Sequence, residues 1–206
     1  MSDFINYVPK NSVKILKSWI NELEIDIIIT NARKTKLGDF RFKNGSSKIT
    51  INNNLNKYSF LITLTHELAH AFIFKEFKNN VLPHGDKWKH KYRSMLLCFL
   101  STDNFPEDIL KELSRFMINP RASTYSDHKL TMVLKKYDKS CCKYILDVKE
   151  GNTFQLFNGR LFVKGKLLRK RYKCIELKTN KIYLFHPYAE VQKHNLRNNV
   201  ILQLFF

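Results

Sequence analysis

Apolar residues in the first part of the chain follow helix spacing once and strand spacing three times. Between Lys10 and Leu23 they recur every three or four positions, which predicts a helix with one apolar face. The β-branched run Ile25–Thr30 predicts a strand. Two shorter strands are predicted at Gly38–Phe42 and Lys48–Asn52, with Asn44-Gly45 as the turn between them.

Three further helices are predicted after these strands. The stretch Tyr58–Phe77 is apolar on most sides, which indicates a buried helix rather than one that faces solvent. Pro83-His84-Gly85 interrupts the chain, and Lys87–Leu100 has the pattern of another helix. Pro106 stands near the first turn of a third helix, which ends near Ile118. Helices combined with a short sheet indicate an α+β domain.

The pattern changes after Asn119-Pro120, where a polar stretch reads as a linker. A short apolar-patterned stretch covers Leu130 to Tyr137. Turn residues then separate strand-like runs, which include Thr153–Phe157, Arg171–Leu177 and Lys181–Phe185. We therefore expect two domains, an α+β domain over residues 1–120 and a basic, β-rich module over residues 121–206.

Composition excludes some classes of protein. No run of about 18 uncharged apolar residues exists, so we expect no membrane span. Residues 1–10 do not have the pattern of a secretory signal. The cysteines Cys98, Cys141, Cys142 and Cys174 form no disulfide framework, which favours a reducing, cytoplasmic location.

Charge is distributed unevenly along the chain. Lys and Arg number 36 against 18 acidic residues, a net charge of +18. Residues 121–206 hold 18 basic and 6 acidic side chains, a net charge of +12. Such an excess favours a polyanionic partner, most simply nucleic acid. The alternative is a general lysine bias in the composition.

His66-Glu67-Leu-Ala-His70 has the HExxH pattern of a metal site. Histidines four residues apart fall on one face of a helix and can bind one zinc ion together. Glu67 then stands beside the metal, where it can take a proton from the zinc-bound water. Two imidazoles and a carboxylate on an otherwise apolar helix would be costly without a partner, and a metal ion supplies one.

His84 is the third ligand that the spacing favours. A metzincin pattern would need glycine and histidine at the positions of Ile73 and Glu76. A thermolysin-like site would need a glutamate about 20 residues downstream, and none stands between Glu76 and Glu107. Three imidazoles and one open position form a catalytic site, so we expect one Zn²⁺ per chain. The strand at Ile49–Asn52 is a candidate sheet edge to which an extended peptide substrate could add.

These motifs resemble the SprT-like family, which includes the Spartan proteases. The similarity rests on HELAH at residues 66–70, HGDKWK at residues 84–89 and the segment Lys36-Leu-Gly-Asp-Phe-Arg41. It implies a small zincin fold with a short sheet, the HExxH helix and packing helices. It also implies His66, His70 and His84 as zinc ligands, Glu67 as general base, and DNA as a partner, because Spartan-type members degrade proteins that are crosslinked to DNA.

The tail departs from that family, in which many members end in a zinc ribbon with two Cys-x-x-Cys knuckles. Cys141-Cys142 and Cys174 do not have this spacing, so we expect a ribbon-like module without metal. Its candidate phosphate contacts are basic residues interleaved with aromatic ones, namely Lys164, Lys166, Arg169, Lys170, Arg171 and Lys173.

The leading hypothesis is therefore a cytoplasmic zinc metallopeptidase that acts on proteins at or near DNA and binds DNA without sequence preference. The alternative is a DNA-associated zinc protein with weak or no proteolytic activity. Glu67 favours the enzyme, because a structural metal site needs no base at that position.

Overall fold

The structure, a computed structural model, describes residues 3–33, 35–78, 80–121, 127–138 and 143–192. The chain divides into two compact units, Met1–Lys139 and Ser140–Phe206. Each unit combines its own elements around its own core. Among the described residues, no helix has both the length and the apolar character that crossing a membrane requires.

The first unit contains a three-stranded sheet whose strand order is β1-β3-β2. Its strands are β1 (Ile25–Thr30), β2 (Gly38–Lys43) and β3 (Ser46–Asn52). β1 pairs with β3 in parallel, and β2 pairs with β3 antiparallel. Asn44 and Gly45 join β2 to β3 with positive φ angles of 52° and 77°, as the predicted two-residue hairpin turn requires. The three predicted strands are confirmed.

The position of β3 corrects one expectation from the sequence. β3 lies in the middle of the sheet and pairs with a strand on each side, so residues 49–52 offer no free edge to a peptide. The edge on this side of the sheet is β2, because the hairpin folds β2 outward from β3. Sequence spacing alone did not reveal that β1 would pair with β3.

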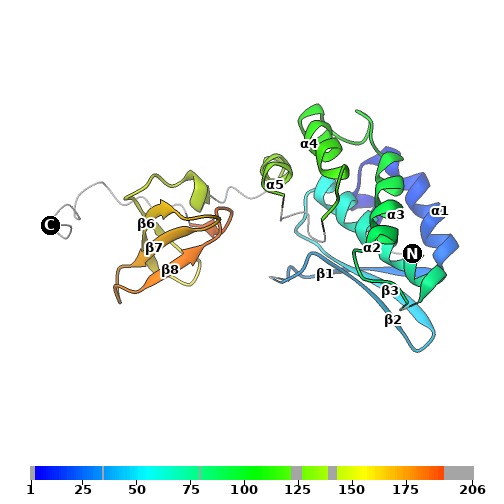
Figure 1. The fold of residues 1–206 in the computed structure, drawn as a ribbon, viewed down its shortest axis with the longest axis horizontal. Helices are drawn as coiled ribbons and strands as arrows, with labels where there is room; N and C mark the ends of the chain where they lie inside the picture. The colour runs from blue at the N-terminus through cyan, green and yellow to red at the C-terminus, as the bar shows by residue number, and fades with distance from the viewer. Residues whose placement is uncertain (1–2, 34, 79, 122–126, 139–142, 193–206) are drawn as a thin grey trace. The chain divides into compact units, whose positions relative to one another are not determined.

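Helices pack against the sheet and against one another (Figure 1). They are α1 (Val13–Leu23), α2 (Lys57–Phe77), α3 (Asp86–Leu97), α4 (Glu107–Met117) and α5 (His128–Lys135). α2 contacts β2 and β3 on one side and α3 on another, which explains why its sequence is apolar almost all round. Asn56 begins α2, since its Oδ1 accepts hydrogen bonds from the backbone N–H groups of Tyr58 and Ser59. The α+β class is confirmed for this unit.

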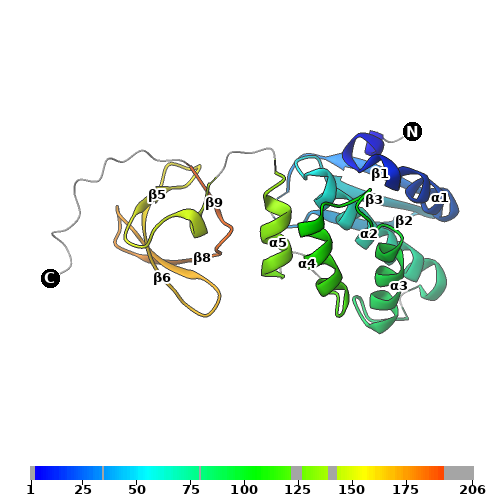
Figure 2. The same ribbon diagram turned by 90° about the horizontal axis from the view of Figure 1, so that it is seen from above.

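α5 belongs to the first unit (Figure 2). It packs on α4, and Asp127 at its N-terminus pairs with Arg115 of α4. The side chain of Asn56 also donates to the carbonyl oxygen of Leu134 at 2.9 Å. The units therefore divide after residue 139, whereas the sequence placed the boundary after residue 120. Residues 140–206 hold 13 basic and 4 acidic side chains, a net charge of +9.

The second unit is built from short antiparallel strands. β5 (Thr153–Gln155), β6 (Leu161–Leu167), β7 (Tyr172–Glu176) and β8 (Ile182–Phe185) form one sheet in that order. β4 (Lys143–Tyr144) pairs with β9 (Glu190–Val191). The buried cluster consists of Ile145, Phe154, Phe162, Cys174 and Val191. The predicted strand-rich character is confirmed, while Cys141 and Cys142 lie outside the described residues.

Candidate metal centre

Two elements bring the three histidines together. His66 and His70 lie one helical turn apart on α2 and face the same side. His84 comes from the short loop between α2 and α3. Its φ angle of 59° is left-handed, a conformation that His adopts more readily than most side chains and that reverses the chain direction. The loop thereby returns the His84 imidazole to α2, as the sequence predicted.

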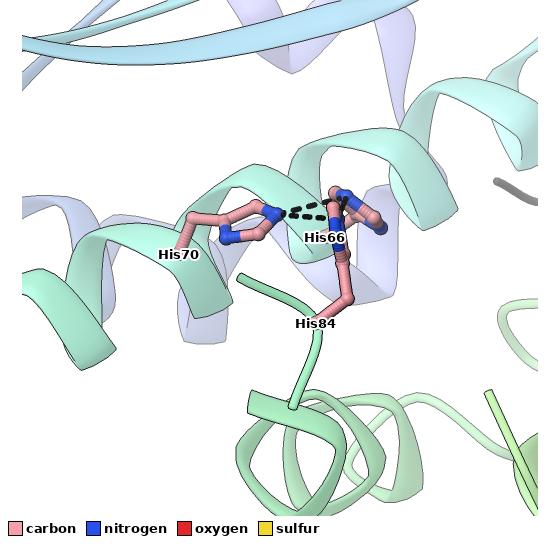
Figure 3. Close-up of side chains that lie close together, drawn as sticks. All are labelled: His66, His70 and His84. Carbon is pink, nitrogen blue, oxygen red and sulfur yellow. Dashed lines mark hydrogen bonds between the residues drawn. The ribbon is translucent and has the colours of Figure 1, made fainter. Parts of the chain in front are cut away.

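The three imidazoles converge through their Nε2 atoms (Figure 3). The separations between these atoms are 3.1 Å for His66 and His70, 3.0 Å for His70 and His84, and 3.3 Å for His66 and His84. A tetrahedral zinc ion with Zn–N bonds of about 2.0–2.1 Å needs ligand nitrogens roughly 3.3 Å apart. The donor set therefore fits zinc. Among the described residues, no other group of His, Cys, Asp or Glu side chains has this geometry.

Trp88 of α3 forms a common packing surface for the three ligands. Its ring centroid lies 4.6 Å from that of His66, 5.1 Å from that of His70 and 4.7 Å from that of His84. Trp88 is 1% exposed and stacks on Tyr92 at 4.8 Å. Sequence reasoning did not assign it a role, although it stands four residues after His84, in the first turn of α3.

Burial gives the site its electrostatic character. It lowers the pKa of His66 to about 2 and that of His70 to about 4, and repulsion from the neighbouring imidazoles adds to the effect. Burial also lowers the pKa of His84. All three rings are therefore neutral at neutral pH, which is the form that binds a metal ion.

Glu67 points between α2 and β2 rather than into solvent. The residue is 8% exposed, and burial raises the pKa of its carboxyl group to about 7, opposed by a hydrogen bond from the backbone of Phe40. In that bond, the Phe40 N–H donates to Glu67 Oε2 at 3.0 Å. A carboxyl group with a pKa near neutrality is suited to general acid–base work.

A cavity of about 820 Å³ opens beside these side chains. His66, Glu67, His70, His84 and Trp88 all line it. Toward the N-terminal end of α2 its wall is formed by Thr63 and by residues 35–39. Toward the C-terminal end of α2 the wall is mostly apolar, with Lys78 beside Phe42, Ile73, Phe74, Val81, Leu82 and Pro83.

The basic residues singled out in the second unit fall into two groups. Lys166, Arg169, Lys170, Arg171 and Lys173 are exposed on the hairpin formed by β6 and β7, and we call them the hairpin cluster. Lys164 differs, because it is 5% exposed and its Nζ donates to the carbonyl oxygens of Leu146 and Val148. Its ammonium group is therefore turned away from any phosphate, and we remove it from the candidate contacts. The alternation of a strand would have shown this, since Lys164 shares its face with the buried Phe162.

Comparisons with known proteins bear on the first unit only. Neither a curated protein nor a solved structure matches the chain. Residues 12–109 match the model of the SprT-like family. The matched region runs from the start of α1 into α4 and includes His66, Glu67, His70 and His84. The match encloses the three-histidine cluster, so the similarity to the SprT-like family and the geometry of the centre concern the same part of the chain.

Proposed function

We propose that this protein is a zinc-dependent metallopeptidase that hydrolyses peptide bonds of proteins at or near DNA, with Glu67 as general base. The observation that carries the proposal is the convergence of three neutral imidazoles, whose Nε2 atoms lie 3.0–3.3 Å apart. A buried glutamate and an open cavity lie beside them. A purely structural zinc site would close its fourth position with a protein ligand, whereas this one leaves it open to the cavity.

Each residue of the centre has a distinct task in this proposal. When bound, zinc would lower the pKa of a coordinated water and polarise the scissile carbonyl. His66, His70 and His84 would hold the ion as neutral ligands, and Trp88 keeps their rings in place. Glu67 would take a proton from the attacking water and pass it to the leaving amine. The Phe40 N–H holds the Glu67 carboxylate on the β2 side of the site.

The shape of the cavity supports an extended polypeptide as the substrate. β2 is an edge strand beside the cavity, so its backbone offers unpaired groups to which a peptide could add. Phe74 lies four residues after His70, about 6 Å along the helix axis. An extended peptide advances about 3.3 Å per residue, so the apolar wall would meet side chains within about two residues of the scissile bond.

The link to DNA rests on the charge of the second unit. The hairpin cluster presents five exposed cations, which is the kind of surface that binds phosphates with little sequence preference. We include a cytoplasmic location in the proposal because the cysteine pattern indicates no disulfide framework.

A cleavage assay with the full chain tests the proposal. Zinc-loaded protein is incubated with a basic DNA-binding substrate protein, with and without DNA, and the matched variant Glu67→Gln serves as control. We expect cleavage by the wild type, stimulation by DNA, and loss of cleavage in Glu67→Gln with zinc content unchanged. General-base removal costs about 10²–10⁴ in rate. Stoichiometric zinc without cleavage under any condition would favour the alternative, a DNA-associated zinc protein without proteolytic activity.

A further inference from the structure

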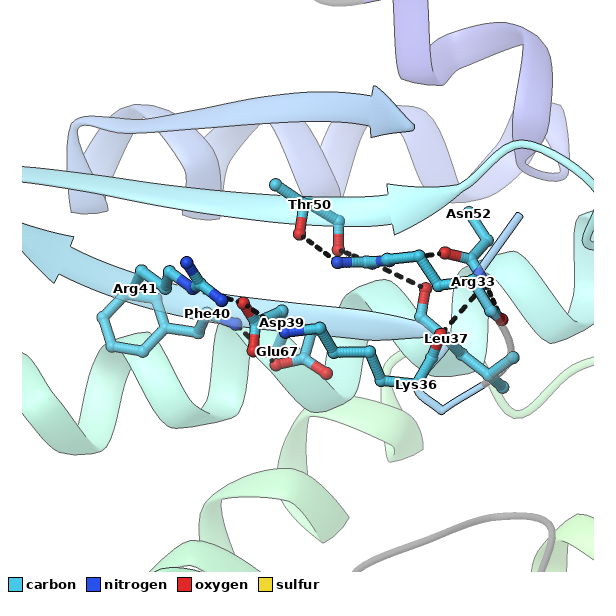
Figure 4. Close-up of polar contacts among 9 residues, drawn as sticks. All are labelled: Arg33, Lys36, Leu37, Asp39, Phe40, Arg41, Thr50, Asn52 and Glu67. Atoms are coloured by element: carbon cyan, nitrogen blue, oxygen red, sulfur yellow. Dashed lines mark hydrogen bonds and ion pairs between the residues drawn. The ribbon is translucent and has the colours of Figure 1, made fainter. Parts of the chain in front are cut away.

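A cluster of hydrogen bonds ties the segment between β1 and β2 to the end of β3 (Figure 4). Arg33 is its centre. The Nε of Arg33 donates to Asn52 Oδ1 at 2.8 Å and its Nη1 donates to Thr50 Oγ1 at 3.0 Å. Its Nη2 reaches the carbonyl oxygens of Thr50 at 3.2 Å and of Leu37 at 3.5 Å. One guanidinium therefore joins β3 to the residue that directly precedes β2.

Asn52 holds the same segment from β3. It is 1% exposed, and its Nδ2 donates to the carbonyl oxygens of Arg33 at 3.1 Å and Lys36 at 3.0 Å. Its backbone N–H donates to the carbonyl oxygen of Leu37 at 2.9 Å. We call these two residues and their contacts the Arg33–Asn52 clamp. The clamp fixes both ends of the segment before β2 begins.

The start of β2 is in turn in contact with the proposed general base. A Cβ atom at Gly38 would lie 2.8 Å from Cγ and Oε1 of Glu67 and from Cγ2 of Thr63, so β2 approaches α2 as closely as a backbone can. Two residues later, the Phe40 N–H donates to Glu67 Oε2. A small shift of β2 would therefore move the Glu67 carboxylate or break its hydrogen bond.

We propose that Arg33 is a positioning residue for Glu67, acting through the Arg33–Asn52 clamp and the first residues of β2. This inference rests on the function proposed above. The planar fork of five N–H donors allows arginine to reach acceptors on three residues at once. Lysine has the same charge but only a single nitrogen. Among the described residues, Arg33 makes no ion pair with a carboxylate, although its charge lowers the pKa of Glu67. Lysine would keep that charge, so replacing Arg33 with lysine isolates the contribution of the hydrogen-bond geometry.

The first test compares Arg33→Lys with Arg93→Lys in the zinc-loaded full chain. Arg93 anchors backbone in a similar way, because it donates to the carbonyl oxygens of Met117 and Ile118 at the end of α4, and none of these three residues lines the cavity. We expect Arg33→Lys to lower kcat by on the order of 10–100-fold, with KM within about threefold and one zinc per chain, since small displacements of catalytic groups are costly. Arg93→Lys should lower the melting temperature similarly and leave kcat unchanged. Equal kcat in the two variants would overturn the inference.

The second test does not depend on turnover. The chemical shift of the Phe40 amide in the zinc-loaded protein reports on its bond to Glu67. When Glu67→Gln is introduced into the otherwise wild-type protein, this chemical shift should change. When it is introduced into the Arg33→Lys variant, the shift should change much less. An undiminished response would contradict positioning by Arg33. If Arg33→Lys does not fold, Asn52→Ser, which removes two of the clamp's donors, provides the same comparison. A wild type that cleaves nothing but retains this response would reject the proposed function and leave the positioning role supported.

Discussion

The two compact units differ at one place, the three-histidine centre, because buried polar side chains elsewhere in the first unit, such as Asn52, have protein partners as those of the second unit do. In the second unit, Lys164 is buried but donates to two carbonyl oxygens, and Glu176 is buried but bonded to Arg160 and Thr179. In the first unit, His66 and His70 are largely buried and their Nε2 atoms lie 3.1 Å apart. When both imidazoles carry their proton on Nδ1, both Nε2 atoms are acceptors and neither can donate a hydrogen bond to the other. A shared metal ion would satisfy the three Nε2 atoms together.

This difference distinguishes buried polar groups that stabilise the fold from buried polar groups that form a binding site. A buried polar group with a protein partner stabilises the fold or fixes a unique arrangement, and it calls for no ligand. A buried polar group whose neighbours offer no complementary partner indicates a ligand. By this criterion the candidate metal centre lies in the first unit, and the second unit contributes surface charge.

The largest expected effect is on metal binding in the first unit. His84→Ala removes one of three ligands, so zinc affinity should fall by more than the roughly 10–100-fold that loss of an outer-shell partner costs. His90→Ala, an exposed histidine of α3, is the matched control and should bind zinc as the wild type does. Competition with a chelator measures both affinities. Equal affinity in the two variants would remove His84 from the centre.

The next effect concerns the exposed charge of the second unit. Replacing Arg169, Lys170 and Arg171 with alanine should weaken DNA binding by roughly 10–100-fold at moderate salt, because each phosphate contact contributes a log–log salt slope of about 0.7–0.9. The slope itself should fall by about 2, equally for different sequences, while zinc content stays the same. Titration of labelled DNA at several salt concentrations measures this. Binding that does not depend on salt would mean that the charge reflects composition alone.

A buried lysine provides a contrast to that exposed cluster. Lys164→Met should leave DNA binding nearly unchanged but destabilise the second unit by about 1–3 kcal/mol, because two buried carbonyl oxygens lose their donor. Lys166→Met, at an exposed position two residues later, should weaken DNA binding and leave the stability of the second unit nearly unchanged. Chemical denaturation alongside DNA titration separates the two outcomes. A loss of DNA affinity in Lys164→Met at unchanged stability would return Lys164 to the phosphate contacts.

The smallest expected effect is on how the stability of the second unit depends on pH. The hydrogen bond from Arg160, together with that from Thr179, lowers the pKa of Glu176 to about 2 from its ordinary value of 4.5. A carboxylate whose pKa is lowered by folding stabilises the fold above pH 4.5, and this stabilisation is lost as the pH falls from 4.5 toward 2. Glu176→Gln should make the melting temperature of the unit depend less on pH over that range. The exposed control Glu190→Gln should keep the wild-type dependence of the melting temperature on pH. If both variants lost this dependence equally, the assignment to Glu176 would be contradicted.

Much of the candidate centre was predictable from the sequence because its determinants are local. The spacing of His66 and His70 matches the helical repeat, and the apolar residues around them predicted that the helix would be buried. His84 followed from elimination by spacing, and the Asn44-Gly45 turn followed from its backbone requirements. These inferences needed no knowledge of which distant segments meet.

Tertiary structure alone decided the rest, because pairing between distant segments is not encoded in any local period. The parallel pairing of β1 with β3 made β2 the edge strand and placed Phe40 over Glu67. Packing of α3 on α2 placed Trp88 beneath the three imidazoles. Contacts of α5 with α4 moved the division between the units to residue 139. The sequence by itself therefore determined which side chains could bind a metal, and the fold decided what holds Glu67 beside them.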